Sequence, residues 1–331
     1  MSIFVIILFC LLIGIGFMAW FVISLFKKPD FSKTPQYYPF KSEKAKEMYY
    51  EYYDKRSADW PVASESKYIV TSFGKTFVRI CGPKKAPSLV LLPSVSASSL
   101  IWISNVKSLA EHFRVYAIDN IYDVGRSINS RLLRNADDLV NWLDELFTAL
   151  ELGDDINLMG LSFGGWLTSQ YALRFPDRLH KIILAAPIAT VLPLPGAWAW
   201  RGIMGAFPHR FFMTTFMVNW AFQDLVKKKD GLSMALVNKI IDDAMMGLKC
   251  YKFRMPITPT VLTDSEWQGI GIPVLFLVGE HEVIYPAKDA IHRLNTIAPA
   301  VKTEIIQDAS HDLTLAQSQI VGDKVTAFLS E

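Results

Sequence analysis

Short apolar segments recur along most of the chain, and stretches with helical periodicity separate them. The apolar segments are rich in β-branched residues and are bounded by Gly, Pro or Asp, which is the pattern of short strands. They span residues 67–73, 74–80, 88–94, 114–119, 156–162, 181–187, 273–279 and 302–308. Between them, stretches such as 136–150 and 287–298 place apolar residues at the spacing of one helix face. Alternating strands and helices predict an α/β fold with a mostly parallel sheet.

The alternation breaks between residues 190 and 269. This segment is rich in Trp, Phe and Met, has little strand character and contains several helical runs. It is also too long for a bare loop. We therefore predict a helical cap over 190–269, inserted into a core formed by 67–189 and 270–331. The cap side chains would either line an apolar pocket or pack only among themselves.

The first residues form the longest apolar run. Residues 2–26 contain no charged residue, and about 25 residues in a helix span roughly 37 Å, more than the hydrocarbon core of a bilayer. A signal peptide would have a shorter run, a preceding basic residue and a small-residue cleavage site. The segment 1–27 is therefore predicted as a transmembrane anchor. Lys27 and Lys28 follow it directly, so the positive-inside rule places the remainder of the chain in the cytoplasm.

Residues 28–66 are predicted as a juxtamembrane linker. Residues 27–56 contain eight Lys or Arg and five Asp or Glu, interleaved with tyrosines. This composition suits a belt at the level of lipid headgroups, and it equally suits an ordinary solvated linker.

Composition and charge narrow the classes of function. With 331 residues, of which 51% are hydrophobic, the chain can build an enzyme-sized core. Cys10, Cys81 and Cys250 form no CxxC pair, which suits a reducing compartment. The net charge is only +2 and no nucleic-acid motif is present, so no nucleic-acid partner is expected. There is also no metal-ligand cluster and no dinucleotide glycine motif, so we expect neither a metal nor a cofactor.

One motif joins a predicted strand to a predicted helix. The sequence Gly160-Leu161-Ser162-Phe163-Gly164 follows the apolar run 156–159 and precedes a helical run. A nucleophilic serine needs a sharp turn of this kind, because its oxygen then projects beside a helix N-terminus while the glycines relieve crowding. The structural alternative is a glycine-rich turn in which the serine is only a small residue. Ser162 is the candidate nucleophile.

Residues 68–329 resemble the α/β-hydrolase family through this motif and through the segments that follow later strands. The resemblance implies a chain order of serine, acid and histidine. Among the histidines after Ser162, only His311 lies just past the final strand, so it is the expected base. Four others fit this order less well: His180, His209, His281 and His292.

The resemblance also implies an acid at the third position after the glycine that ends the strand 273–279, which is Glu282. The family's other acid position follows the strand 181–187, but residues 188–205 contain no Asp or Glu. Glu280 could instead face solvent, and Asp308 and Asp312 could be loop carboxylates beside His311.

Two backbone N–H groups would form the oxyanion hole. One belongs to Phe163, the residue after the nucleophile, and the other, by the family register, to Val95. Pro93 and Ser94 stand where the family usually has His-Gly, so a glycine is missing from this loop. Residues 119–127 resemble another family segment, which we interpret as architecture at the pocket floor.

These residues predict a membrane-anchored serine hydrolase, similar to carboxylesterases and lipases, that acts on small-molecule or lipid esters of apolar acyl groups. Residues 190–260 contain nine Lys or Arg and four Asp or Glu, which would favour contact with anionic membrane lipid. The same triad chemistry could cleave thioesters, peptides or C–C bonds. The alternative is a noncatalytic ligand-sensing or partner-binding protein on the same fold.

Overall fold

The computed structural model describes residues 38–252 and 257–331, together with Gly16 and Ile23. Within these residues, nine strands form one sheet. The strands are β1 (Ser64–Thr71), β2 (Gly74–Cys81), β3 (Ser88–Leu92), β4 (Arg114–Ile118), β5 (Ile128–Asn129), β6 (Ile156–Leu161), β7 (Leu179–Ala185), β8 (Val274–Gly279) and β9 (Lys302–Ile306). Their order is β1-β2-β4-β3-β6-β7-β8-β9, with β5 paired to β2.

The sheet is antiparallel at one side and parallel over the remainder. β2 pairs antiparallel with β1, β4 and β5, and all neighbours from β4 to β9 are parallel. This confirms the predicted mostly parallel sheet. In such a sheet the carboxyl ends of neighbouring strands lie along one edge, which is where sites form in open α/β folds.

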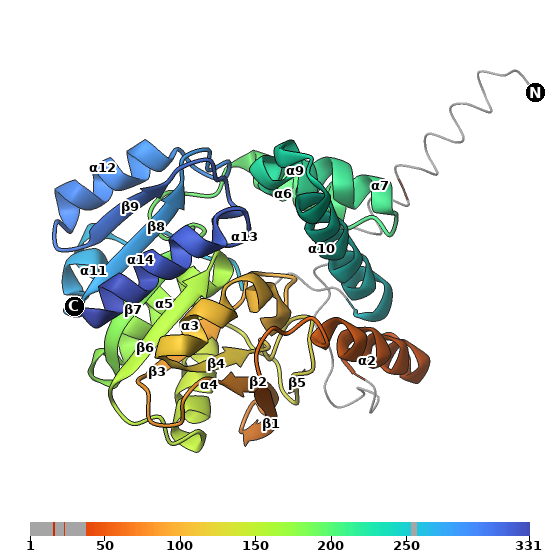
Figure 1. Ribbon diagram of the computed structural model, residues 1–331, viewed down its shortest axis with the longest axis horizontal. Helices are drawn as coiled ribbons and strands as arrows, with labels where there is room; N and C mark the ends of the chain where they lie inside the picture. Colours follow the sequence, from red (N-terminus) through yellow and green to blue (C-terminus); the bar gives the residue numbers. More distant parts are fainter. Residues whose placement is uncertain (1–15, 17–22, 24–37, 253–256) are drawn as a thin grey trace, which may run out of the picture.

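Helices cover both faces of the sheet (Figure 1). Along β3, Leu89 and Leu91 join one apolar cluster while Val90 and Leu92 join the other, because successive strand residues point to opposite faces. The first cluster contains α3 (Val106–His112) and α14 (Ser318–Ser330), and the second contains α4 (Ala136–Ala149), α5 (Phe163–Arg174) and α12 (Ala287–Ile297). The short helices of the core are η2 (Ser99–Ser104), η3 (Pro176–Arg178) and α13 (Leu313–Ala316).

The segment between β7 and β8 is helical, as its sequence predicts. Its helices are α6 (Gly196–Gly205), α7 (Arg210–Phe212), the π-helix η4 (Met213–Val218), α8 (Asn219–Ala221), α9 (Gln223–Lys228), α10 (Gly231–Cys250) and α11 (Asp264–Gly269). Figure 1 shows α6, α7, α9 and α10 gathered at one end of the molecule, whereas α11 lies beside α12. The prediction placed α11 in the cap, but Trp267 buries this helix against the core.

The segment 28–66, predicted as a linker, contains a folded helix. α2 (Glu43–Ser57) packs against α10, and Tyr49 and Tyr53 on α2 are 4% and 1% exposed. Tyr52 donates a hydrogen bond of 2.6 Å to Asp243 on α10. The sequence suited these tyrosines to the level of lipid headgroups or to a solvated linker. In the structure some of them belong to the core, because their spacing places them on the buried face of a helix.

The predicted anchor, residues 1–27, lies outside the described residues apart from Gly16 and Ile23. In the part of the chain that the structure describes, no helix combines the length and apolar character needed to cross a membrane.

Candidate active site

Ser162 lies at the sharp turn between β6 and α5. Its backbone angles are φ 56° and ψ −113°, a conformation that non-glycine residues rarely adopt and that functional sites maintain through their surroundings. The flanking glycines are required: a Cβ on Gly160 would lie 2.0 Å from the carbonyl oxygen of Gly164, and one on Gly164 would lie 2.5 Å from that of Leu92. The sequence pattern therefore corresponds to a real steric requirement at this turn.

His311 lies between Ser162 and Glu282. Its Nε2 is 2.9 Å from Ser162 Oγ, and its Nδ1 is 3.0 Å from Glu282 Oε2 and 3.1 Å from Oε1. These are hydrogen-bond distances, and each ring nitrogen faces a different partner. The three residues come from the ends of β6, β8 and β9, whose parallel arrangement brings them to the same edge of the sheet.

The Glu282 carboxylate is fixed in place. Its side chain is fully buried, and Oε1 accepts the backbone N–H groups of Val283 and Ile284, each at 2.9 Å. These bonds compensate in part for removing a carboxylate from water. The structure therefore places Glu282, and none of the three alternative carboxylates, against the imidazole.

The alternative carboxylates make other contacts. Glu280 accepts the backbone N–H of Asp308. Asp312 accepts the backbone N–H groups of Ser310 at 3.0 Å and of Leu225, in the cap, at 2.9 Å. Burial raises the pKa of the Asp312 carboxyl, and the hydrogen bonds that it accepts oppose this shift.

Phe163 belongs to the nucleophile turn, and Val95 belongs to the loop that approaches this turn. Phe163 is the first residue of α5, where backbone N–H groups have no acceptor within the helix. The loop after β3 contacts the turn closely, since a Cβ on Gly164 would lie 2.7 Å from the carbonyl oxygen of Pro93. Val95 lines the same cavity as His311.

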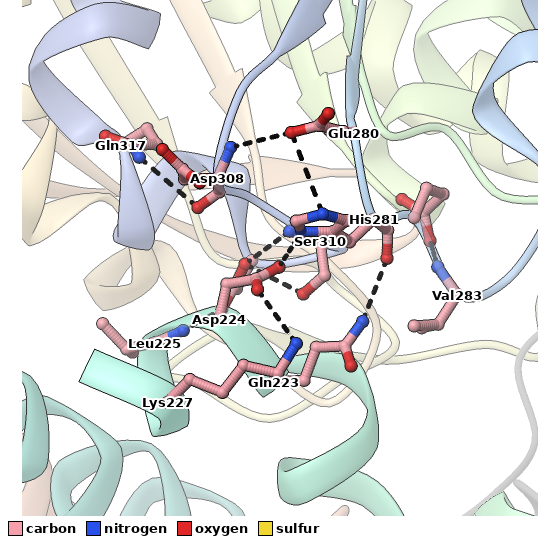
Figure 2. Close-up of polar contacts among 12 residues, drawn as sticks. Gln223, Asp224, Leu225, Lys227, Glu280, His281, Val283, Asp308, Ser310 and Gln317 are labelled. Carbon is pink, nitrogen blue, oxygen red and sulfur yellow. Dashed lines mark hydrogen bonds and ion pairs between the residues drawn. The ribbon is translucent and has the colours of Figure 1, made fainter. Parts of the chain in front are cut away.

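A polar network joins the cap to the loops that carry His311 and Glu282 (Figure 2). His281, which precedes Glu282, has its Nδ1 3.1 Å from Asp224 on α9, and its carbonyl oxygen accepts the side-chain amide of Gln223 at 3.2 Å. Ser310, which precedes His311, donates to the carbonyl oxygen of Ala221 at 3.1 Å. Cap residues 221–225 therefore contact both loops.

A cavity of about 310 Å³ opens beside His311. Its walls come from the cap, from α2 and from the loops after β3 and β4; cap residues in the wall include Trp198, Met213, Met217 and Phe222. Pockets of about 300–1,000 Å³ with mostly apolar walls are typical of small-molecule sites.

Sequence reasoning missed two contributions to this cavity. Tyr49, Tyr52 and Tyr53 of α2 form part of its wall, although their segment was predicted as a linker. Asp123 also lines the cavity, and burial raises the pKa of its carboxyl to about 7, against the lowering effect of hydrogen bonds from the backbone of Val124 and Ser96. The only sequence signal for Asp123 was its position in the segment 119–127.

Comparison with known proteins identifies the family. Residues 87–315 match the family described as alpha/beta hydrolase fold. The chain belongs to this family. The resemblance inferred from the sequence is therefore confirmed. The antiparallel β1–β2 pair of this α/β-hydrolase precedes the matched region, whereas the cap lies within it.

Two proteins of Bacillus subtilis (strain 168) resemble this α/β-hydrolase over most of their length. Carboxylesterase YbfK is 32% identical over 287 residues, which cover 85% of this chain and 93% of that protein. The uncharacterized carboxylesterase nap is 32% identical over 295 residues, covering 85% and 92%. The crystal structure of naproxen esterase (carboxylesterase NP) from Bacillus subtilis has a TM-score of 0.78 at 30% identity and covers 87% of this chain and 99% of that one.

Proposed function

We propose that this α/β-hydrolase is a membrane-anchored serine esterase that cleaves carboxylic esters of apolar acyl groups. The observation that carries the proposal is the position of the His311 ring, within hydrogen-bond distance of Ser162 Oγ on one side and of the Glu282 carboxylate on the other. The carboxylesterase names of relatives at 32% identity support the same reaction class.

In the proposed reaction, His311 transfers protons in both the formation and the hydrolysis of the acyl-enzyme. An imidazole with its proton on Nδ1 donates to Glu282, so its Nε2 can accept the proton of Ser162 as the oxygen attacks the ester carbonyl. The N–H groups of Phe163 and Val95 would stabilise the oxyanion of the tetrahedral intermediate. His311 then protonates the leaving alcohol, and a water activated by the same imidazole hydrolyses the acyl-enzyme.

The apolar walls of the cavity support the choice of acyl group. Trp198, Met213 and Met217 of the cap, and Tyr49 of α2, would surround a hydrocarbon chain. The anchor and the cytoplasmic orientation rest on the uncharged residues 2–26 and on the lysines that follow them. An anchored domain would have access to esters that partition into the bilayer.

Labelling with a fluorophosphonate probe tests the nucleophile. We expect a covalent adduct on Ser162 in the intact protein and its loss in Ser162→Ala, with hydrolysis reduced by at least about 10³-fold. Ser169→Ala removes a second buried serine on α5 and should label normally. A folded protein that does not label would favour the noncatalytic ligand-binding alternative.

The acyl preference has its own test. The rates kcat/KM for p-nitrophenyl esters should rise from acetyl to medium-chain acyl groups, because longer chains bury more apolar surface in the cavity. A preference for acetyl esters would contradict the proposed apolar acyl group while leaving the serine chemistry intact.

A further inference from the structure

The loop after β3 lacks the glycine expected at a tight oxyanion turn, yet it adopts a conformation that favours glycine. Ser96 has φ 57°, in the left-handed region where the Cβ of an L-residue is crowded. Pro93 and Ser94 replace the usual His-Gly, so no glycine in 93–98 relieves the strain. A partner outside the loop must therefore hold this turn.

The Asp123 side chain contacts the strained residue directly. Its Oδ2 accepts the backbone N–H of Ser96 at 2.6 Å, and its Oδ1 accepts that of Val124 at 2.7 Å. Asp123 follows β4 and Ser96 follows β3, and these two strands are parallel neighbours. The bond therefore connects the ends of two strands beside the nucleophile turn.

No cation is paired with the Asp123 carboxylate among the described residues. Burial raises the pKa of this carboxyl, and only the backbone N–H groups of Val124 and Ser96 lower it. A partly buried carboxylate that is held only by backbone N–H groups loses hydration without the compensation of an ion pair. If Asp123 only capped its own turn, one carboxylate oxygen would be enough, and Oδ1 already has this role because it accepts the N–H of Val124. The second oxygen is used on Ser96, the residue after the predicted donor Val95.

Val95, the predicted oxyanion donor, directly precedes the residue that Asp123 holds. Its N–H makes no hydrogen bond to any residue that the structure describes, and Val95 lines the cavity together with His311. The carbonyl of Pro93, two residues earlier, lies against Gly164 of the nucleophile turn. Fixing the peptide between Val95 and Ser96 therefore also restricts the direction of the Val95 N–H.

We propose that Asp123 is a positioning residue, which holds the Ser96 N–H so that the N–H of Val95 faces the oxyanion. The inference rests on the proposed esterase function. The proposal requires Asp123 to accept this hydrogen bond. The bond stabilises a left-handed conformation that a glycine within the loop would adopt without help.

Steady-state kinetics of the full chain on one soluble ester test this role. Asp123→Ala should lower kcat by about 100-fold with little change in KM, because an oxyanion donor acts mainly in the transition state. The inhibition constant of a trifluoromethyl ketone, whose adduct carries the same oxyanion, should rise in parallel. Asp123→Asn loses one of the two acceptor oxygens, but its remaining oxygen can accept the Ser96 N–H, so this variant should retain clearly more of kcat than Asp123→Ala.

A second substitution separates positioning from general damage to the fold. Ser96→Gly makes the left-handed turn favourable without Asp123, so Asp123→Ala combined with Ser96→Gly should recover at least tenfold in kcat. Asp323→Ala, an exposed carboxylate on α14, is the matched control and should behave as the wild type.

The outcomes are distinguishable. Wild-type kcat in Asp123→Ala, a loss confined to KM, or no recovery with Ser96→Gly would each overturn the role of Asp123 while the esterase function stands. A wild-type protein with neither turnover nor inhibitor binding would overturn the proposed function and this inference together.

Discussion

At the scale of single residues, Ser162 shows how a strained backbone is maintained. The turn is sterically possible because Gly160 and Gly164 let three backbone segments approach more closely than any Cβ would allow. The N–H of Ser162 donates to the carbonyl oxygen of Ala185 at 2.8 Å, and its carbonyl accepts the N–H of Trp166 at 3.1 Å. Hydrogen bonds from β7 and α5 thus compensate the unfavourable φ.

Replacing Gly164 by Ala should disrupt this turn. The new Cβ would meet the carbonyl oxygens of Leu92 and Pro93, at 2.5 Å and 2.7 Å, and backbone atoms cannot yield as a flexible side chain would. We expect a loss of about 1–3 kcal/mol in the free energy of unfolding and slower fluorophosphonate labelling of Ser162. Urea denaturation and labelling rates measure both effects.

Gly231→Ala is the matched control for this substitution. Gly231 begins α10 and its added Cβ would have no atom within 4 Å, so stability should stay equal or rise slightly. Equal stability and labelling in both variants would contradict the steric explanation of the motif.

The Asp123 carboxyl predicts a specific dependence of stability on pH. Burial raises its pKa to about 7 in the folded protein, whereas an unfolded aspartate titrates near about 3.9. Between these values the folded state binds more proton, so the free energy of unfolding falls as pH rises from about 4 to about 7. Asp123→Asn cannot titrate and should lack this contribution, which is at most about 4 kcal/mol.

Urea denaturation of wild type and Asp123→Asn across pH 4–8 checks the sign. The free energy of unfolding of Asp123→Asn minus that of the wild type should rise up to about pH 7 and then stay constant. Parallel pH profiles would show that the carboxyl is not perturbed.

The serine motif at a strand-to-helix junction, together with the resemblance to the α/β-hydrolase family, predicted Ser162, His311 and Glu282. The structure brings the three residues together because each follows a strand end and parallel strand ends share one edge. Asp123 was not predicted as a partner of Ser96, since their contact requires β3 and β4 to be neighbours. The sequence pattern of neither strand shows which strand will lie beside it. The pairing of β3 with β4 depends on the order of the whole sheet, so a search for local motifs cannot connect the two loops.

At the scale of elements, the cap and the core are connected through short loops. Residues 221–225 of the cap contact the residues adjacent to Glu282 and His311 (Figure 2). Asp312 is central, because its carboxylate accepts N–H groups from the cap and from its own loop. Docking of the cap therefore also constrains the imidazole.

Asp312→Asn should weaken this connection. The amide nitrogen would replace one acceptor and face a backbone N–H of Leu225 or Ser310. We expect a loss of about 1–3 kcal/mol in stability and a decrease in kcat of about 10- to 100-fold through misplacement of His311. Thermal denaturation and ester hydrolysis measure the two effects.

Asp308→Asn provides the control on the same loop. The Asp308 side chain is exposed and makes no hydrogen bond among the described residues, and asparagine tolerates its φ of 51°. If both variants keep wild-type kcat, the cap contact does not position the imidazole.

The element patterns also explain where prediction of boundaries failed. Helical periodicity identified the cap as helical but gave no reason to separate α11 from it, because Trp267 is apolar in either setting. For α2, charged residues between the tyrosines lowered the apolar contrast that marks a helix face. Only tertiary packing against α10 distinguishes this helix from a solvated linker.

At the scale of the whole molecule, the proposed anchor predicts the behaviour of the full chain in cells. Protein carrying residues 2–26 should remain with the membrane fraction after salt and carbonate washes. Leu8→Arg combined with Leu12→Arg places two charges in this run, each costing about 2.5–3.5 kcal/mol at the bilayer centre. The variant should shift to the soluble fraction and keep its soluble-ester activity.

Leu8→Ala combined with Leu12→Ala keeps the run uncharged and is the matched control, which should stay with the membrane. Wild-type protein released by salt alone would contradict the anchor. Protease protection of a C-terminal tag in intact cells and in inverted vesicles would then test the orientation.

The wall that α2 contributes to the cavity limits how far the chain can be shortened for biochemical work. Removing the predicted anchor would make the protein easier to keep in solution, but a fragment starting at β1 would lose Tyr49, Tyr52 and Tyr53. Such a fragment could keep its nucleophile while its selectivity for the acyl chain is altered, so specificity should be measured only on proteins that retain residues from 38 onward.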